Sequence, residues 1–551
     1  MTTAIKNYEL WLEKVTDKAL KQELEAIRNN QNAIENAFYK DLIFGTGGLR
    51  GEISVGTNCL NIYTIAKATQ GVADYMLRKN LKSVAISYDS RNKSDEFSKV
   101  TACVLASNGI KAYISPTLAP TPHLSFMVRE LKCDMGIMVT ASHNPAKYNG
   151  YKVYDNNGCQ VTDNQANEIL SFIEKIDPFA IKMDTFESYL SKGLISIIDD
   201  SLEGEYIEKV MSYSLDTADG LEVIYSPLNG AGYRIIPQLL TLHSVKLHLV
   251  AEQANPDGNF PTCPYPNPEK PEALALGIEL LKETGADILI ATDPDADRMG
   301  VAVNHKGEIL LLTGNEMGVL IANYIFTKRR ELGILPDNPV LVKTIVSTPL
   351  AHKIANKHGA SVVNVLTGFK YIGEYIKTLE DLKQESRFIF GFEESYGYLA
   401  GTYVRDKDAV IASMLASEMT AYYKKQGKTL IDKINEIYDE FGFYQHQLLT
   451  YTFEGASGNT KMQELLKNLR ANLPLEISGV KVNKTIDYLT QTEFPLPKAD
   501  VISFDLADDS QLIIRPSGTE PLIKAYLTAA ATIEENKKIF EKLKMFLSQI
   551  L

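Results

Sequence analysis

A serine and a histidine stand side by side in the stretch Val-Thr-Ala-Ser-His-Asn-Pro at residues 139–145. The stretch ends an apolar run without polar alternation, which predicts a buried strand of a parallel sheet. Two hydroxyls, an imidazole and an amide in six residues are more polar chemistry than a turn in a core requires. Ser142 is therefore a candidate to carry a reacting group. A plainer interpretation stays open, in which Ser142 or Asn144 caps a following helix by accepting bonds from free backbone N–H groups.

Three carboxylates, Asp293, Asp295 and Asp297, alternate in the segment Asp-Pro-Asp-Ala-Asp-Arg that follows a second apolar run. At positions i, i+2 and i+4 of an extended segment they lie on one side and can converge on a hard cation. An EF-hand loop does not fit, because position six, counted from Asp293, is Arg298 instead of glycine, and position twelve is Asn304 instead of glutamate. Since three like charges this close repel without a counter-ion, the pattern favours a Mg²⁺ site over a solvated acidic turn.

The segment Arg-Pro-Ser-Gly-Thr-Glu-Pro at residues 515–521 offers the parts of a phosphate cradle. Arg515 has a planar fork of N–H donors, and the next residues add hydroxyls and exposed backbone amides. A plain turn with one charged side chain is the alternative.

Two more segments carry candidate groups. Paired glutamates beside a serine in Gly-Phe-Glu-Glu-Ser-Tyr-Gly-Tyr (391–398) can hydrogen-bond vicinal hydroxyls of a sugar, or can be the acidic N-terminus of a helix. The glycine-rich residues 45–51 have neither the Walker ending nor the Gly-x-Gly-x-x-Gly spacing, so nucleotide binding is weakly supported. The notable group in that segment is Arg50.

These loops need strands to position them, and strand-like runs alternate with helical stretches almost throughout the chain. This alternation predicts α/β domains with parallel or mixed sheets, whose active sites lie at the carboxyl ends of strands. No internal repeat is visible in the letters. The expected strands are residues 83–88, 111–114, 135–139, 221–225, 286–292, 339–346 and 388–392, with a helix at 95–107 and an irregular proline-rich loop at 254–273.

Composition describes an ordinary globular protein of 551 residues, 45% hydrophobic and 23% charged. At roughly 150 residues per domain, three or four domains are expected. The longest apolar runs fall short of the about 20 residues that span a bilayer, so no membrane association is expected. The N-terminal segment resembles an amphipathic helix more than a signal peptide. Five scattered cysteines without a Cys-x-x-Cys pair indicate reduced thiols and a cytoplasmic location.

The net charge of −12 argues against a nucleic-acid surface, which needs clustered Lys and Arg. It allows a small anionic substrate if the phosphate site is locally positive. Nucleic-acid partners are therefore not expected, and the sequence leaves the oligomeric state, monomer or dimer, open.

The motifs together are distinctive. Thr-Ala-Ser-His-Asn-Pro, Tyr-Asn-Gly-Tyr-Lys (148–152), Asp-Pro-Asp-Ala-Asp-Arg, Gly-Phe-Glu-Glu-Ser and Arg-Pro-Ser-Gly-Thr-Glu-Pro occur in that order. From about Gly45 onward the chain resembles the α-D-phosphohexomutase superfamily, the phosphoglucomutases and phosphomannomutases. Gly-Phe-Glu-Glu-Ser-Tyr-Gly-Tyr and Arg-Asp-Lys-Asp-Ala-Val (405–410) are most similar to the branch of bacterial phosphoglucomutases and phosphopentomutases.

The resemblance implies three related α/β domains with mixed sheets and a smaller C-terminal α+β domain around a central active-site cleft. Combined with the spacing of the motifs, it predicts the following division: an N-terminal helical extension at 1–40, a domain with the phosphoserine loop at 41–205, a domain with the metal loop at 206–312, a domain with sugar-contacting loops at 313–445, and a domain with the distal phosphate loop at 446–551.

The resemblance also implies a reaction. Ser142 would carry a phosphoryl group and, with Asp293, Asp295 and Asp297, bind one Mg²⁺ per chain. The phosphoserine would transfer its phosphoryl group to a sugar monophosphate, which gives glucose 1,6-bisphosphate. This intermediate would reorient end for end in the site, and the serine would take back the other phosphoryl group. Without a counter-ion the phosphoserine and the aspartates would repel strongly, since one pair of unit charges at 4 Å costs about 4 kcal/mol at an effective dielectric near 20.

The other implied roles are carried over residue by residue. Arg50 and Arg298 would face the phosphoserine. His143 would orient the serine loop, because a hydrolase-type nucleophile needs a Gly-x-Ser-x-Gly elbow that is missing here. Lys152 and Lys407 are the acid/base candidates, and a lysine acts as a base only if its neighbours lower its pKa. The implied substrate contacts are Thr367, Gly368, Glu393, Ser395, Lys407, Arg515, Ser517, Gly518 and Thr519.

The expected activity is therefore that of a phosphoglucomutase, which interconverts α-D-glucose 1-phosphate and glucose 6-phosphate. Phosphomannomutase and phosphopentomutase activity by the same mechanism are alternatives, because the substrates differ by one hydroxyl or one carbon, contacts worth about 1–3 kcal/mol. A catalytically silent sugar-phosphate sensor on the same fold is an alternative of another class.

Overall fold

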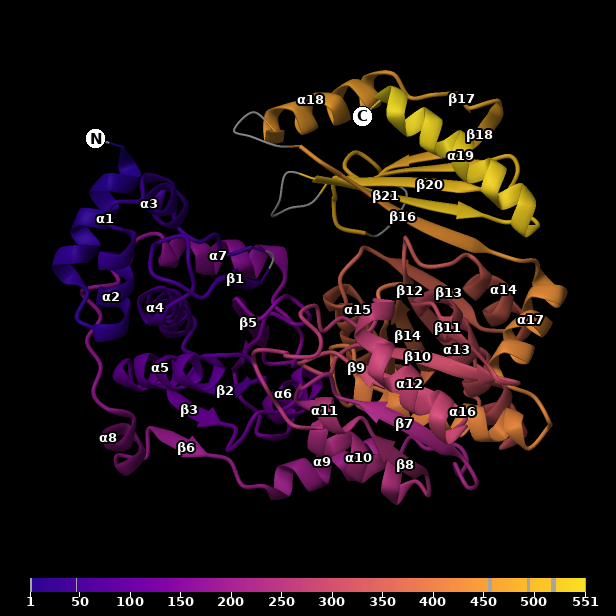
Figure 1. The fold of residues 1–551 in the computed structure, drawn as a ribbon, viewed down its shortest axis with the longest axis horizontal. Coiled ribbons are helices and arrows are strands. Elements are labelled where there is room, and N and C mark those ends of the chain that lie inside the picture. The colour runs from indigo at the N-terminus through magenta and orange to yellow at the C-terminus, as the bar shows by residue number, and fades with distance from the viewer. Residues whose placement is uncertain (1, 46, 454–457, 493–495, 517–521, 551) are drawn as a thin grey trace.

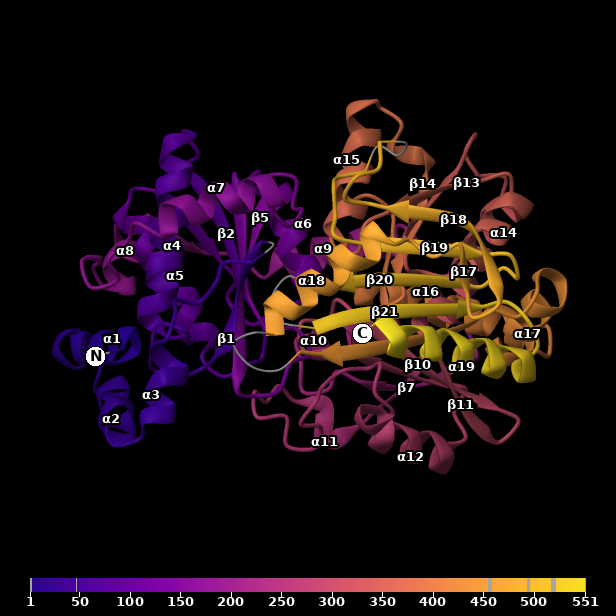
Figure 2. The same ribbon diagram turned by 90° about the horizontal axis from the view of Figure 1, so that it is seen from above.

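The computed structural model describes residues 2–45, 47–453, 458–492, 496–516 and 522–550, and contains three mixed α/β sheets followed by an antiparallel one (Figures 1 and 2). This arrangement confirms the predicted fold class of three related α/β domains and a fourth, smaller β-rich domain. Within those ranges, no helix combines the length and apolarity needed to cross a bilayer.

The N-terminal segment forms three short helices, α1 (Thr3–Lys14), α2 (Lys18–Ile27) and α3 (Gln31–Phe38). Each begins at a polar side chain that accepts a bond from a free backbone N–H group. Trp11 is buried and packs edge-on against Phe38, Tyr63 and Phe179, with ring centroids 5.5–5.7 Å apart. The helices therefore share an aromatic cluster with the first sheet domain.

The first sheet has the strand order β1-β5-β4-β2-β3-β6. Its strands are β1 (Gly48–Glu52), β2 (Ser83–Tyr88), β3 (Lys111–Ile114), β4 (Met135–Val139), β5 (Tyr148–Asp155) and β6 (Ile195–Ile197). The helices of this part are α4 (Ile62–Arg78), α5 (Ser94–Ser107), α6 (Thr121–Glu130), α7 (Asp163–Ile173), α8 (Phe186–Ser191) and α9 (Ser201–Met211). All five residues of β4 are buried, as the unbroken apolar run predicts.

The second sheet has the order β11-β10-β9-β7-β8. Its strands are β7 (Glu222–Ser226), β8 (Lys246–Leu249), β9 (Ile288–Thr292), β10 (Met299–His305) and β11 (Glu308–Leu312). The helices are α10 (Gly232–Leu242), α11 (Ala251–Ala254), the 3₁₀ turn η1 (Pro271–Leu274) and α12 (Ala275–Thr284). The proline-rich loop is irregular between α11 and η1, so the predicted loop is too long by one residue at its N-terminal end and by three at its C-terminal end.

The third sheet has the order β13-β12-β14-β15. Its strands are β12 (Val340–Thr344), β13 (Ser361–Val365), β14 (Phe388–Glu393) and β15 (Gly397–Ala400). The helices are α13 (Gly314–Glu331), α14 (Leu350–Lys357), α15 (Lys370–Asp381), the 3₁₀ turn η2 (Glu385–Arg387), α16 (Ala409–Lys424) and α17 (Leu430–Phe441).

The three sheets share a four-strand unit that the sequence does not reveal as a repeat. In each, the first strand pairs in parallel with the second and the third, and the third pairs antiparallel with the fourth. The units are β2-β3-β4-β5, β7-β8-β9-β10 and β12-β13-β14-β15. The serine, the aspartates and the paired glutamates respectively stand at the end of the third strand or in the turn that joins it to the fourth.

This topology decides two open interpretations. No helix follows the serine loop or the paired glutamates, because each loop returns directly into an antiparallel strand. Helix capping by Ser142 or Asn144 is therefore wrong, and so is the acidic helix N-terminus at Glu393 and Glu394.

The fourth sheet is antiparallel, in the order β16-β21-β20-β19-β18-β17, and lies above the third in Figure 1. Its elements are β16 (Gln445–Thr452), α18 (Gly458–Ala471), β17 (Glu476–Ile477), β18 (Val480–Asp487), β19 (Ile502–Leu506), β20 (Gln511–Pro516), β21 (Leu522–Ala529) and α19 (Ile533–Ile550). A small apolar cluster, including Ile345, Val346 and Ile513, joins it to the third sheet. A much larger continuous core runs through the second and third sheets and α6.

Candidate active site

The serine loop begins where β4 ends and places Ser142 in a buried, left-handed backbone conformation with φ +53°. The Ser142 N–H group donates to Thr140 Oγ1 at 2.8 Å. The hydroxyl donates to Asp293 Oδ2 at 2.8 Å and lies 3.3 Å from His143 Nδ1. Because a non-glycine residue at positive φ is held there only by its surroundings, the loop presents this hydroxyl in one fixed place.

A glycine lets the neighbouring strand pass the loop. A Cβ atom at Gly150 of β5 would lie 2.4 Å from the Thr140 carbonyl oxygen, so no side chain fits between the two backbones. Two residues further along β5, Lys152 extends its amine to Asp295 Oδ2 at 2.9 Å. The close approach of β4 and β5 therefore brings the lysine of the predicted Tyr-Asn-Gly-Tyr-Lys segment to the acidic loop.

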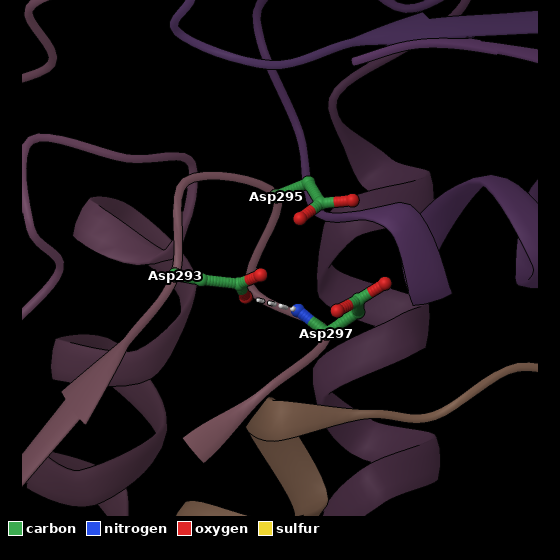
Figure 3. Close-up of side chains that lie close together, drawn as sticks. All are labelled: Asp293, Asp295 and Asp297. Atoms are coloured by element: carbon green, nitrogen blue, oxygen red, sulfur yellow. Dashed lines mark hydrogen bonds between the residues drawn. The ribbon is translucent and has the colours of Figure 1, made fainter. Parts of the chain in front are cut away.

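The three aspartates converge as the spacing predicts (Figure 3). Asp293, Asp295 and Asp297 are buried, and one carboxylate oxygen of each lies within 4.8 Å of the others. The turn is held by backbone donors, since the N–H groups of Asp297 and Arg298 both donate to Asp293 Oδ1, at 3.1 and 3.0 Å. The carboxylates come from one turn and the serine from another sheet, so the site lies between the first and second sheets.

Two lysines lie against these carboxylates. Lys152 contacts Asp295, and Lys407 lies 2.8 Å from Asp297 Oδ2. Burial alone would lower the pKa of each lysine, but the aspartates outweigh it and raise both pKa values above the ordinary range. Both amines are therefore cations here, which suits a proton donor, whereas a base requires a lowered pKa.

The pKa values of the three aspartates are shifted from their ordinary value. Burial and the neighbouring carboxylates raise the pKa of Asp293 and of Asp297. Burial would do the same at Asp295, but Lys152 reverses it and lowers that pKa. Asp295 Oδ1 and Asp297 Oδ1 are buried without any hydrogen-bond donor. Buried carboxylate oxygens without donors are the ligands that a hard divalent cation uses, so this donor set fits Mg²⁺.

Predicted cations surround the serine loop. Arg298 Nη1 donates to Glu269 at 2.7 Å, and its Nε lies 4.0 Å from Asp293 Oδ2. Burial together with the charges of Arg298 and Arg50 lowers the pKa of His143 well below its ordinary value. His143 is therefore a neutral imidazole beside the serine hydroxyl, and Arg50 lies near enough to influence it.

Arg91 and Asp89 are functional candidates that the sequence motifs missed. They follow β2, the parallel neighbour of β4, and both side chains are fully buried, with Arg91 Nε 3.5 Å from Asp89 Oδ2. Arg91 makes five hydrogen bonds to four carbonyl groups of the serine loop and its exit, namely those of Ser142, Asn144, Pro145 and Tyr148. Asp89 accepts from Thr140 Oγ1 at 2.5 Å.

This arrangement holds both sides of the serine peptide. Thr140 accepts from the Ser142 N–H, and Arg91 donates to the Ser142 carbonyl at 2.5 Å through Nη2. The guanidinium also lies over the ring of Phe260 from the proline-rich loop, 5.1 Å from its centroid. An aspartate and an arginine just after a buried strand, at the same sheet edge as the serine, were the available signal.

The paired glutamates stand where β14 ends, with Glu393 as the last residue of the strand and Glu394 in the tight turn to β15. Glu393 Oε1 accepts from the Gly368 N–H at 2.8 Å, which brings Thr367 and Gly368, after β13, to the end of β14. Burial raises the pKa of Glu393 to about 7, although Lys407 opposes the shift. The Ser395 carbonyl accepts from Arg298 Nη1 at 3.2 Å, so the loop of the paired glutamates adjoins the loop of the three aspartates.

Lys343 was not predicted. It lies on β12, its amine donates to the carbonyls of Thr344 and Ser347 at 3.2 and 3.0 Å, and burial lowers its pKa to about 7. Thr344 and Ser347 in turn hold the Glu394 carboxylate. Lys343 and Tyr371 line a cavity of about 830 Å³ between the third and fourth sheets.

Arg515 lies on β20, in the sheet above these loops, opposite Lys524 of β21. Burial and Arg515 lower the pKa of Lys524, and Glu394 opposes the shift. Lys524 therefore lies within electrostatic range of the glutamate loop. Lys524 was missed by the motif search, although it is the cross-strand partner of Arg515. Ser517, Gly518 and Thr519 lie outside the described residues.

Models of known families match most of the chain. Residues 41–179, 204–307 and 313–441 match domains I, II and III of phosphoglucomutase/phosphomannomutase, each described as an alpha/beta/alpha domain.

Similar proteins agree with this match. A phosphoglucomutase of Staphylococcus aureus (strain MRSA252) is 37% identical over 539 residues, covering 94% of this chain and 95% of that protein. A phosphoglucomutase/phosphomannomutase family protein from Burkholderia thailandensis has a TM-score of 0.71 at 18% identity, over 92% of this chain and 97% of that one. The Aspergillus fumigatus N-acetylphosphoglucosamine mutase, solved with GlcNAc-6P and magnesium, has a TM-score of 0.50 at 15% identity, over 97% and 98% of the two chains.

Proposed function

Because the chain belongs to the phosphoglucomutase/phosphomannomutase family of α-D-phosphohexomutases, we propose that it interconverts α-D-glucose 1-phosphate and glucose 6-phosphate through a phosphorylated Ser142. The observation that carries this proposal is the hydrogen bond from the Ser142 hydroxyl to Asp293, one of three buried carboxylates. The similarity to the Staphylococcus aureus phosphoglucomutase along nearly the whole chain supports glucose phosphates as the substrates over mannose or pentose phosphates.

Phosphoryl transfer needs little covalent chemistry from a protein beyond positioning and charge stabilisation. In the forward half-reaction the sugar hydroxyl oxygen forms a bond to phosphorus, the bond from phosphorus to Ser142 Oγ breaks, and the sugar's proton replaces the group on the serine. The second half-reaction reverses these bonds on the other end of the bisphosphate. Ser142 fits the carrier role because its backbone is fixed and its hydroxyl faces Asp293 and His143.

The aspartates would hold one Mg²⁺, with Ser142 as a further ligand. Their unsatisfied oxygens support this assignment, and so does the magnesium in the Aspergillus fumigatus enzyme. When bound, the ion withdraws charge from the phosphoryl group. The charges of Arg298 and Arg50 act on His143 beside the serine, so both side chains are suited to stabilise the phosphoryl oxygens.

Lys152 and Lys407 are the proton donors and acceptors in this proposal. In the described structure both are charged because they neutralise Asp295 and Asp297. A divalent cation at these carboxylates opposes that stabilisation, so loading the site should lower both lysine pKa values toward the working range. Lys407 also lies near Glu393, which supports a role for Lys407 on the sugar side.

In each half-reaction, a mutase must hold the phosphate that does not react in that step. Arg515 and Lys524 are suited to this task, because they lie side by side across two strands and Lys524 lies within electrostatic range of Glu394. Glu393, with Thr367 and Gly368 beside it, is suited to contact the sugar hydroxyls in either orientation.

The test is a comparison of kcat/KM for glucose, mannose and ribose 1-phosphates, with glucose 1,6-bisphosphate as activator. We expect glucose 1-phosphate to be the best substrate. Ser142→Ala should abolish turnover of all three, whereas the control Ser171→Ala, at an exposed serine of α7, should not. A clear preference for mannose or ribose would replace glucose in the proposal, and activity in Ser142→Ala would remove the phosphoserine mechanism.

A further inference from the structure

Three consecutive cations end α13, and only one of them lacks a partner in the described part of the chain. Lys328 pairs with Asp216 at 2.9 Å and with Glu331 at 3.4 Å. Arg330 Nη2 donates to the His358 carbonyl at 3.0 Å. The Arg329 side chain makes neither an ion pair nor a hydrogen bond among the described residues, and its Nε is buried without an acceptor. The last turn of a helix favours a positive charge such as that of Arg329, but this position gives the Nε–H group no hydrogen-bond acceptor.

The Arg329 guanidinium lines a surface pocket of about 250 Å³. Phe388 and Gly401 form buried parts of its wall, and Tyr213 and Thr402 stand beside them. Burial lowers the pKa of Arg329, and Tyr213 opposes the shift. A partly desolvated cation without a counter-ion is costly, and an oxyanion in the pocket that accepts from the two Nη groups would relieve this cost.

We propose that Arg329 is the anchor of a second ligand site, which takes a small oxyanion such as a carboxylate or inorganic phosphate. The pocket is smaller than the roughly 300–1,000 Å³ of sites for larger ligands, so a sugar bisphosphate does not fit this class. The hydroxyl of Ser386 lies on the rim and can add a hydrogen bond. Glu385 also lines the pocket but forms no ion pair with Arg329, and its charge favours a singly charged ligand.

The site is separate from the candidate active site. Phe388 begins β14 and Glu393 ends it, so the two lie roughly 17 Å apart at 3.3 Å per residue. A physical connection exists nevertheless, because the pocket wall at Gly401 and Thr402 continues into the segment that carries Lys407. The Thr402 N–H donates to the Tyr213 hydroxyl at 3.3 Å, and Arg405 donates to the Thr402 carbonyl. A bound oxyanion would therefore order this wall.

The test is hydrogen–deuterium exchange of the full chain, titrated separately with inorganic phosphate and with acetate. We expect saturable protection in peptides that cover residues 325–336 and 397–404. Arg329→Gln should weaken this protection by about tenfold or more, because it removes a charge-assisted fork. Arg329→Lys keeps the positive charge without the planar fork, so its protection should lie between that of the wild type and that of Arg329→Gln. Arg330→Gln, next to it on the same helix, is the matched control and should behave as the wild type.

The two probes distinguish the ligand sources, since whichever protects at the lower concentration identifies the preferred oxyanion. Absence of protection by either probe in the wild type, as expected for a buried water at Nε, overturns the proposal. Equal protection in Arg329→Gln overturns it too. Protection by phosphate around residues 511–516 reports the proposed active site and should be unchanged in Arg329→Gln, so failure of either site is seen independently. A thermal melt of each variant shows whether it folds, and Arg329→Lys remains informative if the glutamine variant does not.

Discussion

Substituting Arg91 should damage phosphoryl transfer although Arg91 does not touch the transferred group. The side chain donates five hydrogen bonds to the carbonyls of the serine loop and its exit, and it is buried against Asp89. Arg91→Lys keeps the positive charge beside Asp89 but has only three N–H donors. The expected result is a folded enzyme whose serine loop is loosened.

The size of the effect follows from these contacts. Lysine loses at least two of the five bonds, which at roughly 0.5–1.5 kcal/mol each is about 1–3 kcal/mol of loop stabilisation. A displacement of about 1 Å at a reacting atom can cost about a hundredfold in rate. We therefore expect kcat to fall by about ten- to a hundredfold with a smaller change in KM. Arg91→Met leaves Asp89 as an unpaired buried charge, which costs about 3–5 kcal/mol and threatens the fold itself.

The assay is steady-state kinetics in both directions, with a thermal melt and a Mg²⁺ titration of each variant. Arg78→Lys, at an exposed arginine that ends α4, is the matched control and should resemble the wild type. If Arg91→Lys kept the wild-type kcat, or lost activity only in proportion to unfolded protein, the positioning role would be refuted.

Further outcomes follow from the site. Ser142→Ala should lose nearly all activity while folding normally, and peptide analysis of the active wild type should find a labile phosphate on Ser142. Asp297→Asn should weaken Mg²⁺ binding and turnover together, and full activity after chelation would contradict the metal assignment. Since the folded-state pKa of Glu393, about 7, lies above its ordinary 4.5, the folded state binds this proton more tightly, and stability from this group falls as pH rises from 4.5 to 7. Over the upper part of that window kcat/KM should rise as the carboxylate forms, and Glu393→Gln should lose both dependences. Arg515→Ala should raise KM for glucose 1-phosphate and glucose 6-phosphate alike and increase release of the bisphosphate. A normal KM in either direction would contradict the proposal that Arg515 binds the non-reacting phosphate.

Local sequence patterns were enough to predict much of the fold and those parts of the site that lie within one short motif. Unbroken apolar runs identified the buried strands β4 and β9, and alternating aspartates identified a convergent acidic cluster, although it lies on a turn and not on the extended segment that was expected. The four-strand unit could not be read from the letters, in which no internal repeat is visible, and only the resemblance to the phosphohexomutases implied three related domains. The strand pairing of this unit explains why no helix follows Ser142, which a cap-like residue pattern had left open.

The remaining site residues are brought in by tertiary structure. Arg91 stands 51 positions before Ser142 and reaches it only because β2 and β4 are parallel neighbours. Lys524 meets Arg515 through strand register. The charge of Lys152 and Lys407 depends on carboxylates from another sheet, so no local sequence could show that their pKa values are raised.

The central claim is that Ser142 carries the phosphoryl group between the two ends of the sugar, and a single-turnover experiment tests it most directly. Enzyme labelled with ³²P-phosphate, with the label mapped to Ser142, is mixed with unlabelled glucose 6-phosphate and Mg²⁺ and quenched at successive times. The account predicts that label leaves the protein at a rate no slower than kcat and appears first in glucose 1,6-bisphosphate. Label that stays on the protein during steady interconversion, or that leaves only as inorganic phosphate, would contradict it.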